Sequence, residues 1–161
     1  RLAALPGPRL GLVWASAGGG DDALRKSASL ADFAPLAGLG SVVSLQKGPP
    51  AAEAGSPPPG LSLTDWTAEL DDFAETAALI QGLDAVVSVD TAVLHLAAAL
   101  GVRTFALIQH VPDWRWPAAD RDRTPWYPEM RLFHQGRDLR WGDAIANLAG
   151  ALPPLLAFTP R

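Results

Sequence analysis

The sequence contains no cysteine and only three histidines among its 161 residues. Without cysteine the chain can form neither disulfides nor thiolate sites, and a zinc site would have to use histidine and carboxylate ligands alone. The three histidines are scattered along the chain and do not predict such a site. We therefore expect no bound metal ion and no cofactor.

An excess of basic residues and a long apolar run are also missing. Lysine and arginine number 13 against 17 aspartates and glutamates, a net charge of −4 at pH 7. A nucleic-acid partner normally requires a clustered basic face, so we expect any phosphate bound here to belong to a small molecule. No apolar run approaches the roughly 20 residues that span a bilayer, and residues 1–8 lack the hydrophobic core of a signal peptide. We expect no nucleic-acid partner, no membrane-spanning segment and a cytoplasmic location.

The first residue is Arg1 rather than methionine, and a proline- and alanine-rich approach precedes the first apolar strand pattern. Such a start is typical of an excised segment. The length is about that of one domain, and an apolar content of 48% is ample for one core. We therefore predict that residues 1–161 form a single domain, and that this domain is a fragment of a longer protein.

Short apolar segments rich in β-branched residues alternate with helical patterns along the chain. This alternation predicts an α/β protein with a Rossmann-like, doubly wound parallel sheet of about six strands. No G-x-G-x-x-G follows the first predicted strand, which disfavours a nicotinamide enzyme. Residues 17–22 are predicted as a flexible loop, and residues 46–60 as a loop or a short frayed helix. The predicted strands are 10–15, 41–45, 61–63, 84–89, 104–108 and 131–134, and the predicted helices are 31–39, 71–83, 91–100 and 141–152.

The segment 88–101, S-V-D-T-A-V-L-H-L-A-A-A-L-G, is the most informative in the chain. It joins a predicted buried strand to an alanine- and leucine-rich helix, with Asp90 and Thr91 as N-cap residues and Gly101 at the helix end. The first turn of a helix has unpaired backbone N–H groups and the positive end of the helix dipole. In open parallel sheets, ligands bind beyond the carboxyl ends of the strands. The junction therefore predicts a phosphate-binding site.

Four motifs in a fixed order include and surround this segment: S-L-Q-K-G, V-S-V-D-T-A-V-L-H-L-A-A-A-L-G, V-P-D-W-R-W and W-Y-P-E-M-R-L-F. Nearly the whole chain resembles the C-terminal, donor-binding half of the heptosyltransferase-like family 9 glycosyltransferases, especially the bacterial members fused behind tetratricopeptide repeats. The resemblance implies the GT-B architecture, in which two Rossmann-like domains face each other across a cleft. Ala92 stands where heptosyltransferases usually carry glycine, so the resemblance leaves the donor sugar open.

The resemblance implies the donor-binding domain of an inverting, metal-independent glycosyltransferase that uses a nucleoside-diphosphate sugar. The catalytic base is expected in the absent N-terminal acceptor domain, so the catalytic residues stay unknown and the isolated chain is expected to be inactive. One alternative is a non-catalytic nucleotide-sugar-binding or scaffold domain of a tetratricopeptide-repeat protein. It is motivated by the first-strand loop, W-A-S-A-G-G-G-D-D-A-L-R-K-S, which is richer in glycine and poorer in basic residues than in the relatives. A sugar-nucleotide epimerase, which shares the two-domain architecture, is a further alternative.

The segment after the fourth predicted strand supplies half of the candidate donor-binding residues. Asp90 would accept hydrogen bonds from donor hydroxyls or order the turn. The backbone of Thr91, Ala92 and Val93 would offer N–H groups to the diphosphate. His95 resembles the family's histidine and either approaches the phosphates or the sugar, or is a hydrogen-bonded core histidine of an apolar helix.

Other candidates lie in the loops after the first two predicted strands. Lys47 can reach a phosphate or the ribose, and Gln46 or Glu53 can hydrogen-bond ribose hydroxyls. Ser16 and Lys26 flank the first loop and resemble positions that meet the diphosphate, where charge grows during bond cleavage. Gln46, Lys47 and Glu53 are also typical of ordinary loop residues exposed to solvent. The alternative for the first loop is that its glycines only make it mobile.

Four tryptophans, Trp66, Trp114, Trp116 and Trp126, also lie in loops after strands. Here a large ring can stack on a nucleobase or pack across the cleft between domains, and we favour interdomain packing. The D-W-R-W segment additionally allows Arg115 to stack on a neighbouring indole, as in a rigid lid.

Overall fold

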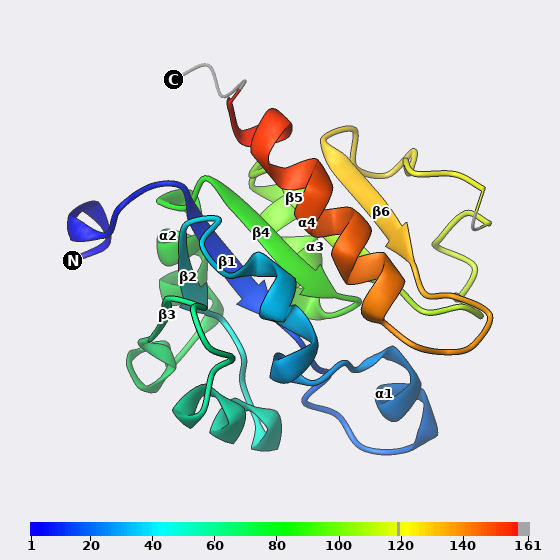
Figure 1. Ribbon diagram of the computed structural model, residues 1–161, viewed down its shortest axis with the longest axis horizontal. Coiled ribbons are helices and arrows are strands. Elements are labelled where there is room, and N and C mark those ends of the chain that lie inside the picture. The colour runs from blue at the N-terminus through cyan, green and yellow to red at the C-terminus, as the bar shows by residue number, and fades with distance from the viewer. Residues whose placement is uncertain (119, 158–161) are drawn as a thin grey trace.

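The computed structural model describes residues 1–118 and 120–157 (Figure 1). Within these residues, six strands form one sheet in the order β3-β2-β1-β4-β5-β6, and every neighbouring pair is parallel. The α/β prediction with a doubly wound parallel sheet is therefore confirmed, and the order is that of a Rossmann-like fold, as one half of a GT-B protein requires. The strands are β1 (Arg9–Val13), β2 (Ser41–Ser44), β3 (Leu63–Asp65), β4 (Ala85–Val89), β5 (Thr104–Ile108) and β6 (Met130–His134).

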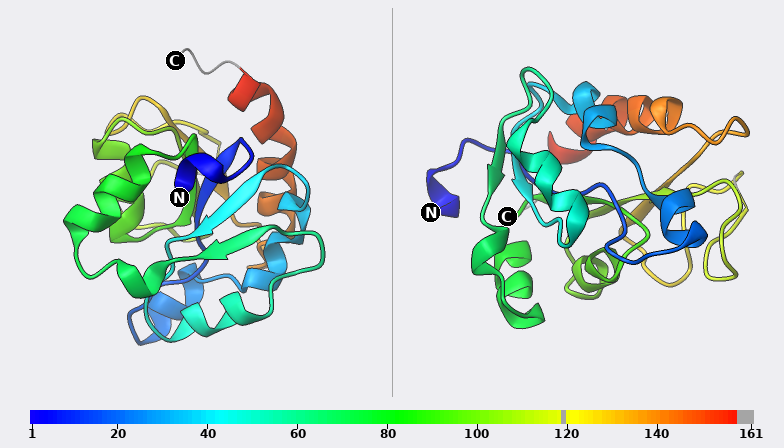
Figure 2. Two further views of the ribbon diagram at one scale, coloured as in Figure 1. Left: turned by 90° about the vertical axis from the view of Figure 1, so that its left-hand side faces the viewer. Right: turned by 90° about the horizontal axis from the view of Figure 1, so that it is seen from below.

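Helices cover both faces of the sheet (Figure 2). On one face lie η2 and α4, and on the other lie α2 and α3. Among the described helices, none is both long enough and apolar enough to cross a bilayer. The helical elements are η1 (Leu2–Ala4), α1 (Asp21–Lys26), η2 (Leu30–Leu36), η3 (Pro49–Gly55), η4 (Thr67–Glu69), α2 (Phe73–Gln81), α3 (Ala92–Ala99) and α4 (Gly142–Ala157).

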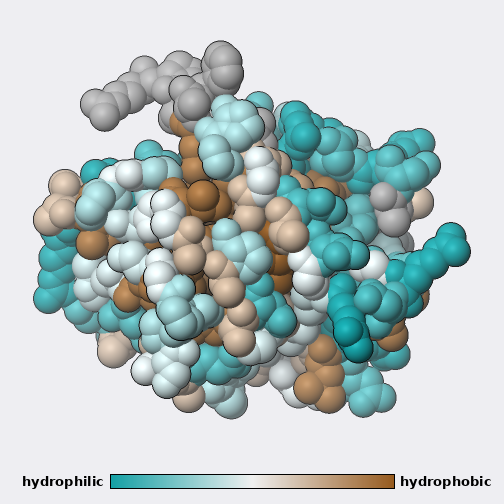
Figure 3. Space-filling model, in the orientation of Figure 1, coloured by the Kyte–Doolittle hydropathy of each residue, from teal (hydrophilic) through white to brown (hydrophobic). Residues whose placement is uncertain are grey.

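The central strands are buried on both faces, which explains their nearly continuous apolar sequence. Alternate side chains of β1 point to opposite faces. Leu10 and Leu12 belong to the core cluster under η2 and α4, whereas Val13 belongs to the cluster under α2 and α3. The outer surface is mixed. In Figure 3, hydrophilic side chains gather over the right-hand side, where β6 and the segment leading to it lie in Figure 1.

Three helical predictions need correction. The last two residues of the predicted loop 17–22 are helical, because residues 21–26 form α1, which is stabilised by two aspartates in its first turn and two basic residues in its last. The predicted helix 31–39 is the 3-10 element η2, because Pro35 lacks the N–H that a continuing α-helix needs. Helix α4 does not stop before Pro153 but runs to Ala157, since Leu152 and Leu156, one turn apart, keep the same face against the core.

The predicted single domain included residues 119 and 158–161, which lie outside the described residues. The third strand also differs from its prediction: it spans 63–65 rather than 61–63. It pairs with β2 through Leu63, Thr64 and Asp65. The glycine and proline cluster before it obscures where the extended pairing begins, because turn residues carry no strand periodicity.

His134, at the carboxyl end of β6, is expected to make folding sensitive to mild acid. Burial lowers the pKa of its imidazole below 6.5. The hydrogen bond at 3.0 Å between Nε2 and the Arg121 carbonyl and the nearby charge of Asp120 both raise this pKa, but burial outweighs them. The unfolded chain then binds the proton more readily, so stability is full above pH 6.5 and falls as the pH drops through 6.5 toward the lower folded-state pKa.

Thermal unfolding followed by circular dichroism from about pH 7.5 to about pH 5.5 measures this effect. The parent chain is expected to lose more of its melting temperature over that range than the H134Q variant, whose amide keeps an N–H donor but does not titrate. Parallel losses in the two proteins would contradict the assignment.

Candidate functional site

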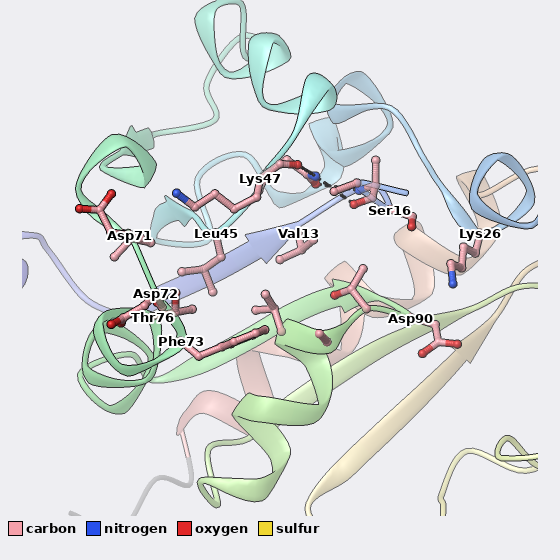
Figure 4. Close-up of a pocket in the computed structure, with 17 residues that line it drawn as sticks. Val13, Ser16, Lys26, Leu45, Lys47, Asp71, Asp72, Phe73, Thr76 and Asp90 are labelled. Atoms are coloured by element: carbon pink, nitrogen blue, oxygen red, sulfur yellow. Dashed lines mark hydrogen bonds between the residues drawn. The ribbon is translucent and has the colours of Figure 1, made fainter. Parts of the chain in front are cut away.

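A pocket of about 460 Å³ lies beyond the carboxyl ends of β1, β2 and β4 (Figure 4). After β1 the chain builds the sheet toward β3, then returns to place β4 on the other side of β1. The pocket therefore sits at the point where the strand order reverses, the usual ligand position in open α/β sheets. Eight of the ten predicted donor-binding residues line it: Ser16, Lys26, Gln46, Lys47, Asp90, Thr91, Ala92 and Val93.

Gln46 holds the strand ends together beneath this pocket. Its Oε1 accepts hydrogen bonds from the backbone N–H groups of Trp14 at 3.0 Å and Ala15 at 2.8 Å. Its Nε2 donates to the carbonyls of Ala15 at 2.9 Å and Lys47 at 2.8 Å. The side chain is fully buried. Both ends of the amide are thus engaged with the backbone, and Gln46 joins the end of β2 to the end of β1.

Gly48 allows the two loops above Gln46 to approach each other. Its φ is +76°, and a Cβ placed on it would lie 2.8 Å from the Cβ of Ala17, which lines the pocket. A side chain at position 48 would therefore be strained and would push the first loop away. This close approach explains why the residue after Gln46 and Lys47 is a glycine.

Two lysines flank the pocket on opposite sides (Figure 4). Lys26, from α1, lies on the side of Asp90, and its Nζ is 3.3 Å from Asp22 Oδ2. Lys47 lies on the side of Asp71, and its Nζ donates to the carbonyl of Thr67 at 2.5 Å. Each partner leaves ammonium protons free for a ligand, because an ammonium group has three donors.

The N-terminus of α3 opens onto the pocket. Thr91 is its N-cap residue, as predicted, but its hydroxyl makes no capping hydrogen bond and lies 3.1 Å from Ser88 Oγ instead. At a helix start the N–H groups of Thr91, Ala92 and Val93 have no carbonyl within the helix to bond to, whereas the N–H of Leu94 donates to the carbonyl of Thr91 at 3.1 Å. Because Thr91, Ala92 and Val93 all line the pocket, this helix end faces the space where a ligand would sit.

Asp90 has a carboxylate that contacts protein groups on the far side of the pocket wall. Oδ2 accepts a hydrogen bond from Trp116 Nε1 at 3.0 Å, and Oδ1 lies 3.4 Å from His95 Nε2. A guanidinium nitrogen of Arg115 is 3.8 Å away. The residue is only 9% exposed. Of the two predicted roles of Asp90, these contacts favour ordering the turn.

The pKa of Asp90 lies below its ordinary value. Burial is the largest influence and opposes ionisation. The hydrogen bonds from His95 and Trp116 outweigh it, with help from the charges of Lys26 and Arg115. Asp90 is therefore an anion at neutral pH, a structural charge rather than a proton acceptor.

His95 does not line this pocket. Its ring stacks on Trp116, with centroids 5.5 Å apart and planes inclined by 19°. Its Nδ1 is 3.0 Å from the hydroxyl of Tyr127, and its other nitrogen faces Asp90. The imidazole is half-buried and hydrogen-bonded at both nitrogens, which places it in the wall behind Asp90.

Glu53 also lies elsewhere. Its Oε2 accepts hydrogen bonds from the Ser29 hydroxyl at 3.0 Å and the Leu30 N–H at 2.7 Å, at the start of η2. It is not among the residues that line the pocket. In this position Glu53 ties η3 to η2.

Sequence reasoning missed the wall of the pocket formed by the start of α2. Asp72 was predicted to open this helix, and its Oδ1 does accept the Glu75 N–H at 2.9 Å. The sequence did not indicate that Asp71, Asp72, Phe73 and Thr76 line the site. Phe73 is 61% exposed there. An apolar residue at the first position of a helix was the available signal.

The four tryptophans divide into two groups. Trp66 packs against the core cluster under α2 and α3, and Trp116 is buried behind Asp90. Trp114 and Trp126 are exposed and meet edge to face. Arg115 is paired with Asp113 and Asp90 in this region. Across residues 1–118 and 120–157, no group of three or more histidine or acidic side chains is placed to hold a metal ion.

A family model matches part of the chain. Residues 63–133 match the model of "Glycosyltransferase family 9 (heptosyltransferase)". The matched segment contains Asp90, α3, Trp116 and Tyr127. The match supports a glycosyltransferase-like function.

A curated relative covers more of the chain. "Protein FlbA" of Caulobacter vibrioides (strain ATCC 19089 / CIP 103742 / CB 15) is 28% identical over 153 residues, which is 91% of this chain and 25% of that protein. The chain therefore spans about a quarter of the length of the relative it matches. No solved structure matches the chain.

Proposed function

We propose that this chain is the donor-binding domain of an inverting, metal-independent glycosyltransferase, and that the pocket at the reversal of strand order binds a nucleoside-diphosphate sugar. The observation that carries the proposal is the uncapped N-terminus of α3, which shares this pocket with Lys26 and Lys47. Backbone N–H groups, a helix dipole and two ammonium groups together form a site for a small polyanion in a chain of net charge −4.

The two ends of the pocket differ in chemistry, which supports one orientation of the donor. Lys26 and Asp90, which precedes α3, lie at one end of the pocket, so we place the diphosphate there, between the Lys26 ammonium group and the start of α3. Phe73 and Asp71 lie at the other end. An exposed aromatic ring suits a nucleobase, and a carboxylate suits ribose hydroxyls, so we place the nucleoside there.

Sugar transfer builds negative charge on the departing diphosphate, and groups already aimed at that charge lower the barrier. Lys26 and the start of α3 would supply this stabilisation without a metal ion, while Lys47, on the side of Asp71, would contact the ribose. We place the base that activates the acceptor hydroxyl in an N-terminal acceptor domain of the longer protein. We also propose that the longer protein contains tetratricopeptide repeats. The chain alone is then expected to bind the donor without turning it over.

A nucleotide-sugar-binding or scaffold domain without catalysis is the second candidate. The contacts of Asp90 favour it, because its carboxylate is buried and held by Trp116 and His95. A nucleotide-sugar-binding domain without catalysis differs from the first candidate only in whether the longer protein transfers a sugar, whereas a pure scaffold domain does not require nucleotide binding.

Calorimetric titration of the chain with ADP, UDP, GDP and dTDP tests the binding proposal. The decisive variant is A92P. Position 92 is the first residue of α3, where proline fits the helix and removes only one N–H, and Thr91 already has the extended backbone that proline requires. Because A92P loses one hydrogen bond to the charged diphosphate, we expect it to bind the nucleotides about tenfold or more weakly than the parent chain.

The matched control is A92S, which changes the side chain but keeps the N–H. It should bind as the parent chain does, and both variants should keep the parent melting temperature within about 4 °C. If none of the four nucleotides binds, or if A92P binds as well as A92S, the diphosphate does not sit at the start of α3.

A further inference from the structure

A second pocket, of about 390 Å³, lies behind Asp90. It is distinct from the pocket onto which the start of α3 opens, which we name the nucleotide pocket. We name this second pocket the aromatic pocket. One side is formed by α3 and the other by the chain between β5 and β6. Its lining residues are His95, Trp114, Arg115, Trp116, Trp126 and Tyr127.

The two pockets share a wall. Asp90 lines the nucleotide pocket, and its carboxylate contacts three of the residues that line the aromatic pocket: Trp116, His95 and Arg115. The two pockets therefore lie on opposite sides of the Asp90 carboxylate.

Two indoles of the aromatic pocket are exposed, and hydrogen bonds hold one of them, Trp126. Trp114 is 82% exposed and Trp126 is 58% exposed, and their rings meet edge to face with centroids 6.3 Å apart. Trp126 Nε1 donates to the carbonyl of Arg115 at 3.0 Å, and its backbone N–H donates to Thr124 Oγ1 at 3.3 Å. Large apolar rings fixed at the surface indicate a binding site, because leaving them in water is unfavourable.

Polar groups interrupt the aromatic lining. The Arg115 guanidinium is partly exposed and is anchored by Asp113. The hydroxyl of Tyr127 accepts from or donates to His95 Nδ1 and retains capacity for a second partner. The pocket thus combines flat apolar surfaces with hydrogen-bonding groups at their edges.

A pyranose ring has the complementary form. Its axial C–H groups make an apolar face, and its hydroxyls lie around the edge. The face of an indole is electron-rich and attracts polarised C–H groups, while arginine and tyrosine reach hydroxyl oxygens. A nucleobase matches less well, because the exposed rings of Trp114 and Trp126 are perpendicular, at 89°, and offer no parallel slot.

We propose that the aromatic pocket binds a pyranose ring, with Trp114 and Trp126 as its stacking surfaces. The proposal rests on the proposed function, which places a nucleotide sugar in the adjoining pocket. The ring comes either from that donor or from a separate glycan, and the experiment distinguishes the two sources.

Trp114 is the residue to vary, because it is the more exposed of the two and does not hold the Arg115 carbonyl as Trp126 does. W114Y keeps an aromatic face, whereas W114L keeps apolar bulk without one. L139A is the matched control, since Leu139 is also an exposed apolar residue but lies outside the aromatic pocket. Unchanged melting temperatures show that each variant folds.

The first arm compares ADP, UDP and GDP with ADP-glucose, UDP-glucose and GDP-mannose by calorimetry. If the bound ring belongs to the donor, W114L should bind the sugar conjugate about fivefold more weakly than the parent chain and bind the plain nucleotide equally well. W114Y and L139A should bind both ligands nearly as the parent chain does. The second arm uses methyl glucoside and methyl mannoside with saturation-transfer NMR. If the bound ring belongs to a separate glycan, the C–H signals of these glycosides should show contact with the parent chain. W114L should abolish this contact, and a sugar conjugate should not displace the glycoside.

The proposal is overturned if W114L matches the parent chain in both arms. It is also overturned if the parent chain binds the sugar conjugates no more tightly than the plain nucleotides and the glycosides show no contact. Failure of the proposed function gives a different result. In that case the plain nucleotides do not bind the parent chain, and the glycoside arm alone decides on the aromatic pocket.

Discussion

Replacing Gln46 with leucine is expected to lower the free energy of unfolding by about 3 kcal/mol or more, although the two side chains are similar in size. Gln46 satisfies two backbone N–H groups and one carbonyl in the buried space between β1 and β2, at Trp14 and Ala15. Leucine fills that space but bonds to none of them. A buried polar group without a partner costs about 1–3 kcal/mol, so three such groups outweigh the gain from an apolar side chain.

Urea denaturation followed by circular dichroism measures the loss. The matched control is Q81L, since Gln81 is exposed at the end of α2 and should change stability by no more than about 0.5 kcal/mol. Equal midpoints for Q46L and Q81L would show that the Gln46 hydrogen bonds contribute little. A destabilised Q46L should also lose nucleotide affinity, because Gln46 supports the Lys47 side of the pocket.

The second large effect is expected for D90A in the longer protein. Sugar transfer should fall by about 100-fold or more, because the variant releases Trp116 and His95 from the wall of the donor pocket. The buried indole N–H of Trp116 also loses its acceptor, which costs about 1–3 kcal/mol of stability. D90N separates the two effects, since an amide keeps an acceptor oxygen for Trp116 but removes the charge near Lys26.

Radiolabelled transfer from a nucleotide sugar to the protein's acceptor measures this prediction. The control D143A removes an exposed carboxylate at the start of α4 that lines neither pocket, so it should retain activity. If D90A transfers sugar as the parent protein does, the pocket is not the donor site. If the parent protein transfers no sugar while the chain binds nucleotides, the scaffold alternative holds.

The region from β4 to α3 was predictable because its signals are local. A β-branched buried strand, two polar residues and an alanine-rich helix follow one another within residues 85–101, and the carboxyl end of a parallel strand is a known ligand position. The parallel sheet followed from the same logic, since alternating strands and helices form parallel sheets, whereas the order of the strands was not predicted.

The wall behind Asp90 was not predictable in this way. The chain between β5 and β6 has no helical or strand period, so nothing in its sequence indicates that Trp116 returns to Asp90, 26 positions earlier. Gln46 presents the same difficulty. A glutamine after a strand is typical of a solvated loop, and its buried bonds depend on the backbone of Trp14 and Ala15 in the neighbouring strand. Such contacts are set by tertiary packing.

The position of Asp90 between two cavities has a consequence for how ligands influence each other. If a ring in the aromatic pocket repositions the carboxylate and thereby changes the affinity for a nucleoside diphosphate by some factor, thermodynamic linkage requires the nucleotide to change the affinity for the ring by the same factor. The residue at position 90 then acts as the coupling element of a cooperative pair of sites. A donor whose two halves bind together would be retained longer than either half alone.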